Sequence, residues 1–191
     1  IHSSVTEKIE NLNHVVLDLD KTSQDKINSK EFTTEQFGFP LAGSLIPWID
    51  EDLDNGISKE EWKGQTETNK ILSPTFNSIK VDGLCVRIGT MRSHSQALTI
   101  KLKKNINLEK VENLLTNGNN WVKFVANNKT DSANYLTPAT VSGKLDIAIG
   151  RVRMLDLEDN VISAFTVGDQ LLWGAAEPLR RMLNILIKKE S

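Results

Sequence analysis

The stretch that decides the fold is Val81–Lys104, which reads VDGLCVRIGTMRSHSQALTIKLKK. Its second half alternates, with apolar residues at positions 98, 100 and 102 and polar residues at 99, 101 and 103. This period of two predicts a strand with one buried face and one solvated face. Gly89 and the polar segment from Thr90 to Ser93 come before it and allow a bend. We therefore expect two strands joined by a turn.

The same stretch carries Arg87 and His94, seven residues apart. On an unbroken strand this odd offset would place the two side chains on opposite faces, so a shared pocket requires the bend. A guanidinium binds a carboxylate through two parallel hydrogen bonds, and an imidazole exchanges protons near neutral pH. Taken singly, Arg87 is equally explained as a surface residue and His94 as a hydrogen-bonded edge residue.

The composition is that of a globular protein of one or two domains, with 191 residues, 39% hydrophobic and 25% charged. A net charge of -2 gives no electrostatic argument for nucleic acid or an anionic membrane, and no apolar run is long enough to span a bilayer. One cysteine permits no internal disulfide and suits a reducing cytoplasm. The chain starts at Ile1 without a signal-peptide layout, so we expect a processed, trimmed or partial cytoplasmic chain.

Periodicity and helix signals predict the other elements. Ser58 and Glu61 form a capping box that starts a helix of about four turns, ending before Pro74. We expect an amphipathic helix over residues 106–117, strands over 121–125, 145–157 and 161–167, and a polar loop over 127–134. The alternation shifts phase at Gly150, a candidate bulge. A last helix follows residue 170, with a kink or a restart at Pro178.

Two acidic segments, residues 20–31 and 50–61, look like calcium-binding loops. Such a loop needs glycine at its sixth position for a sharp turn, and Asp25 and Asn55 stand there instead. A calcium-binding module therefore remains only an alternative, and we predict no metal site. Cys85, the sole thiol, lies on a predicted apolar strand without a basic neighbour, which indicates a buried and unreactive cysteine.

These residues belong to a longer pattern. Val81–Lys104 resembles the segment of bacterial aspartate-β-semialdehyde dehydrogenases that carries their substrate arginine and general-base histidine. Three more runs, at residues 37–72, 135–155 and 164–183, resemble the same family in the same order. The resemblance extends from about Val16 to Ile187.

The resemblance implies roles for the substrate-binding side chains. Arg87 would clamp the substrate carboxylate, and His94 would act as the general base. Glu60 would hold the substrate's ammonium group, with Glu61 as the alternative, and Lys63 would bind phosphate. Without the resemblance, Glu60 and Lys63 would be interpreted as a solvated ion pair on a helix surface.

The resemblance also implies the fold. It predicts the α+β class, with a mixed, largely antiparallel sheet and helices on one face, as in the C-terminal domain of proteins like glyceraldehyde-3-phosphate dehydrogenase. Residues 1–167 would form a catalytic and dimerisation domain, incomplete on its N-terminal side. Residues 168–191 would form a helix that packs on an absent nucleotide-binding domain. Gln170 would lie near the nicotinamide of NADP, with helix capping as the alternative.

The implied enzyme interconverts L-aspartate 4-semialdehyde and L-aspartyl 4-phosphate for lysine (by way of diaminopimelate), threonine and methionine biosynthesis. It forms a thioester, passes hydride to NADP and admits phosphate as the final nucleophile. No glycine fingerprint follows a predicted strand, so this sequence lacks the dinucleotide-binding half, and in the family the nucleophilic cysteine lies upstream as well. We expect a homodimer with no turnover by this chain alone. A non-catalytic dimerisation remnant is the other alternative.

Overall fold

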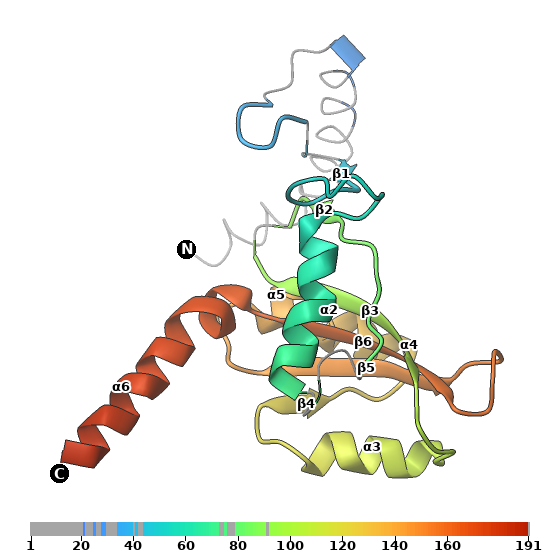
Figure 1. The fold of residues 1–191 in the computed structure, drawn as a ribbon. Coiled ribbons are helices and arrows are strands. Elements are labelled where there is room, and N and C mark those ends of the chain that lie inside the picture. Colours follow the sequence, from blue (N-terminus) through green and yellow to red (C-terminus); the bar gives the residue numbers. More distant parts are fainter. Residues whose placement is uncertain are drawn as a thin grey trace, which may run out of the picture. The chain divides into compact units, whose positions relative to one another are not determined.

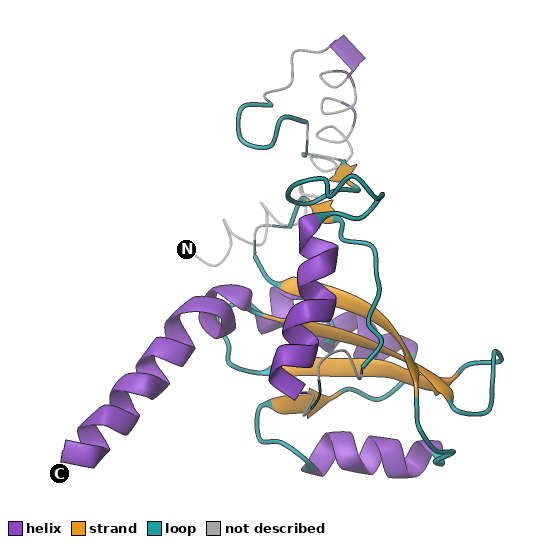
Figure 2. Ribbon diagram, viewed as in Figure 1, coloured by secondary structure: helices purple, strands orange, loops and turns teal. Residues whose placement is uncertain are grey.

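The computed structural model describes residues 34–39, 41, 44–72, 75, 79–90 and 92–190, together with the single positions 21, 25, 28 and 29. The chain forms two compact units that divide between Gly89 and Thr90. Figure 1 labels their helices and strands, and Figure 2 colours them by type. The predicted boundary after residue 167 is a different one: it separates a C-terminal helix that would pack on an absent domain. That boundary stays a prediction.

The first unit contains helix α2 (Lys59–Leu72) and a two-stranded antiparallel sheet of β1 (Leu45–Ile46) and β2 (Arg87–Ile88). The predicted capping box starts α2. The Ser58 backbone N–H donates to Glu61 Oε2 at 2.8 Å, and the Glu61 backbone N–H donates to Ser58 Oγ at 3.3 Å. These reciprocal bonds satisfy donors that a helix start otherwise leaves free, so the helix begins where the sequence predicts.

The second unit contains a four-stranded sheet in the order β3-β6-β5-β4. Its strands are β3 (His94–Lys101), β4 (Val122–Phe124), β5 (Ile147–Met154) and β6 (Val161–Gly168). The β3–β6 and β5–β6 pairs are antiparallel, and β4 runs parallel to β5. The α+β class with a mixed, largely antiparallel sheet is therefore confirmed.

Two hydrophobic clusters on opposite faces of this sheet form its core. One face packs against helix α3 (Leu108–Asn117), and its cluster contains Val111, Val152, Ile162 and Ala164. The other face packs against α4 (Lys129–Tyr135) and α5 (Pro138–Val141), and its cluster contains Val125, Leu136, Val141, Ala148 and Val167. In β6, Ile162 and Ala164 belong to one cluster and Val167, of opposite parity, to the other, as the period of two requires. In β5, Ala148 and Val152 have the same parity but belong to different clusters, because the register shifts between Gly150 and Arg153. The expectation of helices on one face thus needs refinement, since helices contact both.

The prediction of a polar loop over residues 127–134 was wrong. Helix α4 occupies most of this segment, and α5 follows it. Both helices begin at side-chain caps. Asn128 Oδ1 accepts from the Asp131 backbone N–H at 2.8 Å, and the Thr137 side chain caps α5 with Pro138 in its first turn. Proline suits a first turn because its missing N–H would be unpaired there. These helices depend on caps and carry little apolar periodicity, which is why the pattern did not predict them.

The bulge predicted at Gly150 is present. The β5–β6 register shifts between Gly150 and Arg153, and Arg151 has a φ of 55°. A side chain at Gly150 would be tightly crowded. A Cβ there would lie 3.0 Å from the Val125 carbonyl oxygen and 3.1 Å from Leu136 Cδ2. Glycine therefore allows the close approach of β5 to the segment after β4.

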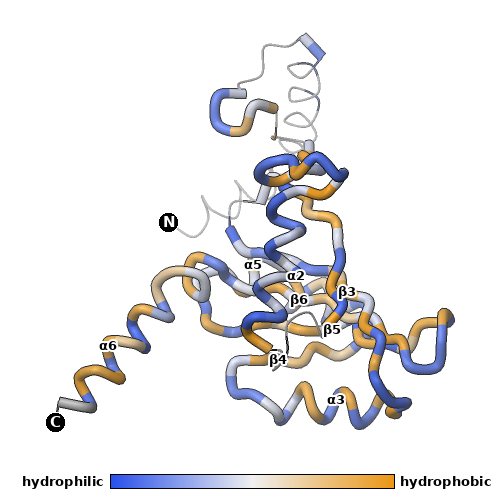
Figure 3. Tube along the Cα trace, viewed as in Figure 1, coloured by the Kyte–Doolittle hydropathy of each residue, from blue (hydrophilic) through white to orange (hydrophobic). Residues whose placement is uncertain are grey.

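The C-terminal segment consists of a π-helical turn, η1 (Leu172–Ala176), and helix α6 (Glu177–Glu190). The helix continues from the π-turn into α6 without a break, so there is no restart at Pro178, but its hydrogen bonding changes from π to α one residue earlier. The guanidinium of Arg181 lies over the rings of Trp121 and Trp173, 4.5 and 4.8 Å from their centroids. Beyond this contact α6 extends away from the sheet with several apolar residues exposed, among them Leu179, Met182, Leu183 and Leu186 (Figures 1 and 3). Among the described residues, no helix is both long and apolar enough to cross a membrane.

Candidate functional site

The five predicted site residues divide between the two units. Glu60, Lys63 and Arg87 lie in the first unit, and His94 and Gln170 lie in the second. The expectation that Arg87 and His94 line one pocket involves both units and stays a prediction. The two predicted strands exist, but β2 and β3 belong to different sheets.

Lys63 is held between two carboxylates. Its Nζ donates to Asp50 Oδ2 at 2.6 Å and to Glu60 Oε2 at 3.1 Å. The hydrogen bonds to Asp50 and Glu60 raise the pKa of Lys63 above its ordinary value, and the bond from Lys63 lowers the pKa of Asp50. Lys63 is therefore a permanent, partly exposed cation with three donors, the kind of group that binds a phosphate oxygen. A phosphate there would compete with Asp50.

Glu61 uses both of its carboxylate oxygens in the fold. Oε2 accepts from the Ser58 backbone N–H, and Oε1 accepts from the Cys85 backbone N–H at 2.8 Å. The hydrogen bonds from Cys85 and Ser58 lower the pKa of Glu61. Glu61 thus joins the start of α2 to the segment before β2, whereas Glu60 spends one oxygen on Lys63. This arrangement favours Glu60 over Glu61 as the substrate ligand.

Arg87 lies at a cavity of about 430 Å³ in the first unit. Its guanidinium is 4.8 Å from the centre of the Phe37 ring, a cation–π arrangement that holds the charge at an apolar wall. The lining combines this cation with aromatic and aliphatic side chains and two acids: Phe37, Phe39, Ile46, Trp48, Ile49, Asp50, Asp52 and Arg87. Asp50 lines this cavity and also pairs with Lys63, so it connects the two predicted anion-binding cations.

Cys85 has the chemistry of a structural cysteine. Burial raises the pKa of its thiol, and the charges of Glu61 and Glu60 raise it further. A raised pKa leaves less thiolate at neutral pH, and the thiolate is the nucleophile. The raised pKa agrees with the predicted low reactivity, but Cys85 is only half-buried and lies just before β2, so the predicted burial on a strand was wrong.

Side-chain oxygens of the second calcium-like segment, residues 50–61, stabilise turns. Asp50 Oδ1 accepts from the Glu51 backbone N–H, Asp52 Oδ1 from that of Asp54, and Asn55 Oδ1 from that of Ile57. The first calcium-like segment, residues 20–31, lies largely outside the described residues. In the part of the chain that the structure describes, no group of three or more His, Cys, Asp or Glu side chains could hold a metal ion.

In the second unit, His94 begins β3, is exposed, and pairs with Gly168 at the end of β6. Gln170 does not cap the following helix. Asp169 does so, because its Oδ1 accepts from the Leu171 backbone N–H at 3.1 Å. The Gln170 Oε1 atom is buried and has no hydrogen-bond partner among the described residues. The role predicted for Gln170 near the nicotinamide stays a prediction.

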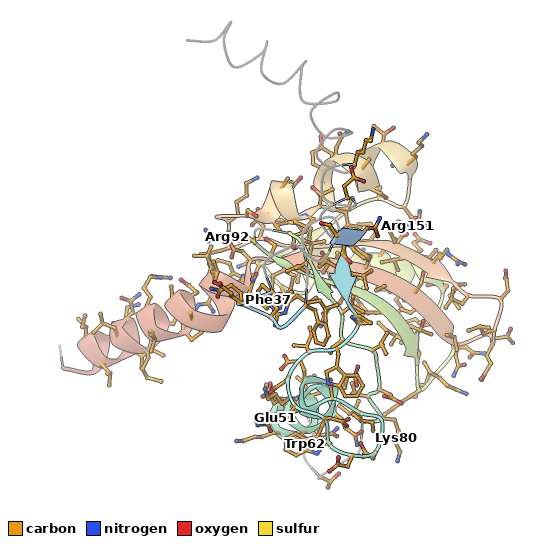
Figure 4. The ribbon with its side chains drawn as sticks, turned by 90° about the horizontal axis from the view of Figure 1, so that it is seen from above. Phe37, Glu51, Trp62, Lys80, Arg92 and Arg151 are labelled. Atoms are coloured by element: carbon orange, nitrogen blue, oxygen red, sulfur yellow. The ribbon has the colours of Figure 1, made fainter. Side chains whose placement is uncertain are left out.

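Sequence reasoning missed two residues beside His94. Arg92 and Asp169 form an ion pair, with Arg92 Nε 2.6 Å from Asp169 Oδ2. Figure 4 labels Arg92, which lies where the sheet meets the beginning of the C-terminal helix. The two residues are 77 positions apart, so no local pattern could have revealed the pair. Asp50 was considered only as part of a calcium loop, and its contact with Lys63 also had no local signal.

Comparisons with known proteins agree on one group. Residues 5–173 match the family described as "Semialdehyde dehydrogenase, dimerisation domain". Aspartate semialdehyde dehydrogenase from Francisella tularensis is 48% identical, with a TM-score of 0.75 over 93% of this chain and 47% of that one. Aspartate semialdehyde dehydrogenase II from Vibrio cholerae is 28% identical, with a TM-score of 0.73 over 82% and 44%. The same Vibrio cholerae enzyme, in a structure complexed with ASA, is 26% identical, with a TM-score of 0.74 over 88% and 49%. The chain therefore spans about half the length of these relatives.

Proposed function

The chain belongs to the semialdehyde dehydrogenase dimerisation-domain family, and on that premise we propose that it supplies the substrate-binding and proton-transfer groups of an aspartate-semialdehyde dehydrogenase. The proposed enzyme is NADP- and phosphate-dependent and interconverts L-aspartate 4-semialdehyde and L-aspartyl 4-phosphate. This reaction serves lysine, threonine and methionine biosynthesis. The enzyme would be a cytoplasmic homodimer, and groups that this sequence does not carry, the nucleophilic thiol and the nucleotide-binding half, would complete it.

The observation that carries the proposal is the charge arrangement of the first unit. The semialdehyde substrate carries a carboxylate and an ammonium group, and the second substrate is an anion. Arg87 presents a guanidinium at a largely apolar cavity, Glu60 presents a carboxylate, and Lys63 presents an ammonium. The opposite charge of each side chain matches one group of the two substrates.

His94 would transfer the proton. Its unprotonated imidazole would accept the proton of the attacking thiol, and the imidazolium would return it when phosphate displaces the sulfur. NADP, when bound, supplies the hydride acceptor. Gln170 would orient the nicotinamide by accepting an amide N–H at its buried, unpaired Oε1.

The test is turnover with and without a separately expressed nucleotide-binding half that carries the thiol. We expect no phosphate-dependent NADPH formation from the purified chain alone, and restored turnover from the mixture. Lys63→Gln should raise the KM for phosphate in the mixture. Lys59→Gln is the matched control, because Lys59 pairs with Glu51 at 2.9 Å on the same helix. Equal effects of the two substitutions would contradict the phosphate assignment, and turnover by the chain alone would contradict the need for an external thiol.

The description of the matched family as a dimerisation domain favours a second candidate, a non-catalytic dimerisation module. The same mixing experiment distinguishes it. Such a module would remain dimeric in analytical ultracentrifugation but restore no turnover to a nucleotide-binding half that is shown to be folded and to bind NADP.

A further inference from the structure

A buried carboxylate directly follows Gly168, the strand residue that pairs with the predicted general base His94. Asp169 follows β6 and is 0% exposed. His94 and Gly168 form the last pair of the β3–β6 ladder, and Arg92 and Asp169 lie just beyond that pair on the two chain segments. The ion pair between them therefore closes the end of the ladder at which His94 lies.

Asp169 joins three segments. Its Oδ2 accepts from Arg92 Nε and from the Gly143 backbone N–H, both at 2.6 Å, and its Oδ1 accepts from the Leu171 backbone N–H at 3.1 Å. Gly143 has a φ of 77°, a conformation that glycine adopts without steric cost. Burial tends to raise the pKa of Asp169, but the Gly143 and Arg92 hydrogen bonds outweigh this effect and hold its pKa below the ordinary value. The carboxylate is thus charged at neutral pH, and its position is fixed by donors from three directions.

Ser93 lies between the ion pair and His94 in a strained conformation. It is buried, and its φ of 81° is in the left-handed region, which side chains other than glycine rarely adopt. Its Oγ lies 3.0 Å from Ser142 Oγ, and Ser142 Oγ donates its single hydrogen to the Pro138 carbonyl at 2.6 Å. Ser93 must therefore be the donor to Ser142. Ser93 directly precedes His94, so its backbone conformation sets the direction in which the chain enters β3.

We propose that Asp169 is a positioning residue, which through Arg92 and the strained Ser93 fixes the orientation of His94 and through its own backbone fixes Gln170. This proposal deepens the proposed function, because it concerns how the same base is aimed. Residues held in rare conformations persist where their surroundings determine them, and they occur often at sites of function. Asp169 is fully buried, so its effect on the reaction would be indirect.

The first experiment is nuclear magnetic resonance on the 191-residue chain, which needs no turnover. We expect Asp169→Asn and Arg92→Gln to abolish the coupling constant and Cα shift that report a positive φ at Ser93, and to shift the ring signals of His94. Val152→Ala is the control, since Val152 is fully buried in the same unit but lies outside this network. The proposal is overturned if a folded Asp169→Asn chain keeps the Ser93 and His94 signals, or if Val152→Ala changes them equally. Should Asp169→Asn not fold, Arg92→Lys, which retains the charge, and Arg92→Gln decide the question in the same way.

The second experiment uses the mixture of the chain with the nucleotide-binding half. A base displaced by about 1 Å costs roughly 100-fold in rate, so we expect Asp169→Asn to lower kcat by about that factor with little change in the KM for the semialdehyde. If the unsubstituted mixture is active and Asp169→Asn leaves its kcat unchanged, the positioning role is overturned. Absence of turnover in the unsubstituted mixture would count against the proposed function, whereas the resonance experiment would still decide whether Asp169 orients His94.

Discussion

Replacing Gly150 with alanine tests the packing of the second unit. The added Cβ would lie 3.0 Å from the Val125 carbonyl oxygen and 3.1 Å from both Val125 Cβ and Leu136 Cδ2. Leu136 can rotate, but the Val125 carbonyl is backbone, and the Val125 N–H is held at 2.8 Å by the Ile149 carbonyl. Overpacking costs about 1–3 kcal/mol, and the rigid neighbour points to roughly 2 kcal/mol or more. For a unit of about 100 residues this lowers Tm by roughly 8–16 °C.

Amide hydrogen exchange at Val125 measures the same effect locally, because this amide bonds directly to β5. A loss of about 2 kcal/mol corresponds to roughly 30-fold faster exchange. Gly174→Ala is the matched control, since a Cβ at Gly174 meets no atom within 4 Å. In the Gly174→Ala chain, the exchange rate of the Val125 amide and the Tm should stay close to those of the unsubstituted chain. If Gly150→Ala is no more destabilising than Gly174→Ala, the close approach at the bulge does not constrain residue 150.

Three further predictions follow from individual charges and from the thiol. Arg180 and Arg181 lower the pKa of Glu177 to about 2, from an ordinary 4.5, so the stability that Glu177 contributes should be complete above pH 4.5 and lost as the pH falls toward 2. The difference in unfolding free energy between the unsubstituted chain and Glu177→Gln, measured by urea denaturation, should shrink over that interval, and a constant difference would contradict the assignment. Asp50→Asn should strengthen binding of inorganic phosphate at Lys63 several-fold in a titration of the isolated chain, whereas Asp54→Asn, which alters an acid without a contact to Lys63, should not. The thiol of Cys85 should react with iodoacetamide at pH 7 more slowly in the folded chain than in urea because its pKa is raised, and equal rates would refute this.

Local signals predicted local structure. Ser58 and Glu61 are three residues apart and determine the start of α2 by themselves, and the phase shift in the sequence located the bulge at Gly150. Helices α4 and α5 were missed because Asn128 and Thr137 start them through caps within a polar segment that has no apolar stripe.

Site contacts between distant positions could not be predicted in this way. Lys63 and Asp50 are 13 residues apart, and Arg92 and Asp169 are 77 apart. The roles predicted for the site residues came from the resemblance to a family and not from local sequence patterns. The hydrogen bond to Asp50 that raises the pKa of Lys63, and the positive φ of Ser93 next to His94, are visible only in the tertiary structure.

The stacking of Arg181 on two indole rings has a practical consequence. Trp121 immediately precedes β4, Trp173 lies in η1, and the two rings meet edge to face with their centroids 5.4 Å apart. Indole fluorescence depends on its immediate surroundings, and the guanidinium that lies over both rings belongs to the C-terminal helix. A molecule that binds and tilts that helix is expected to change the emission of both tryptophans. The chain therefore contains an intrinsic optical reporter of what its last helix binds, with no need for an attached dye.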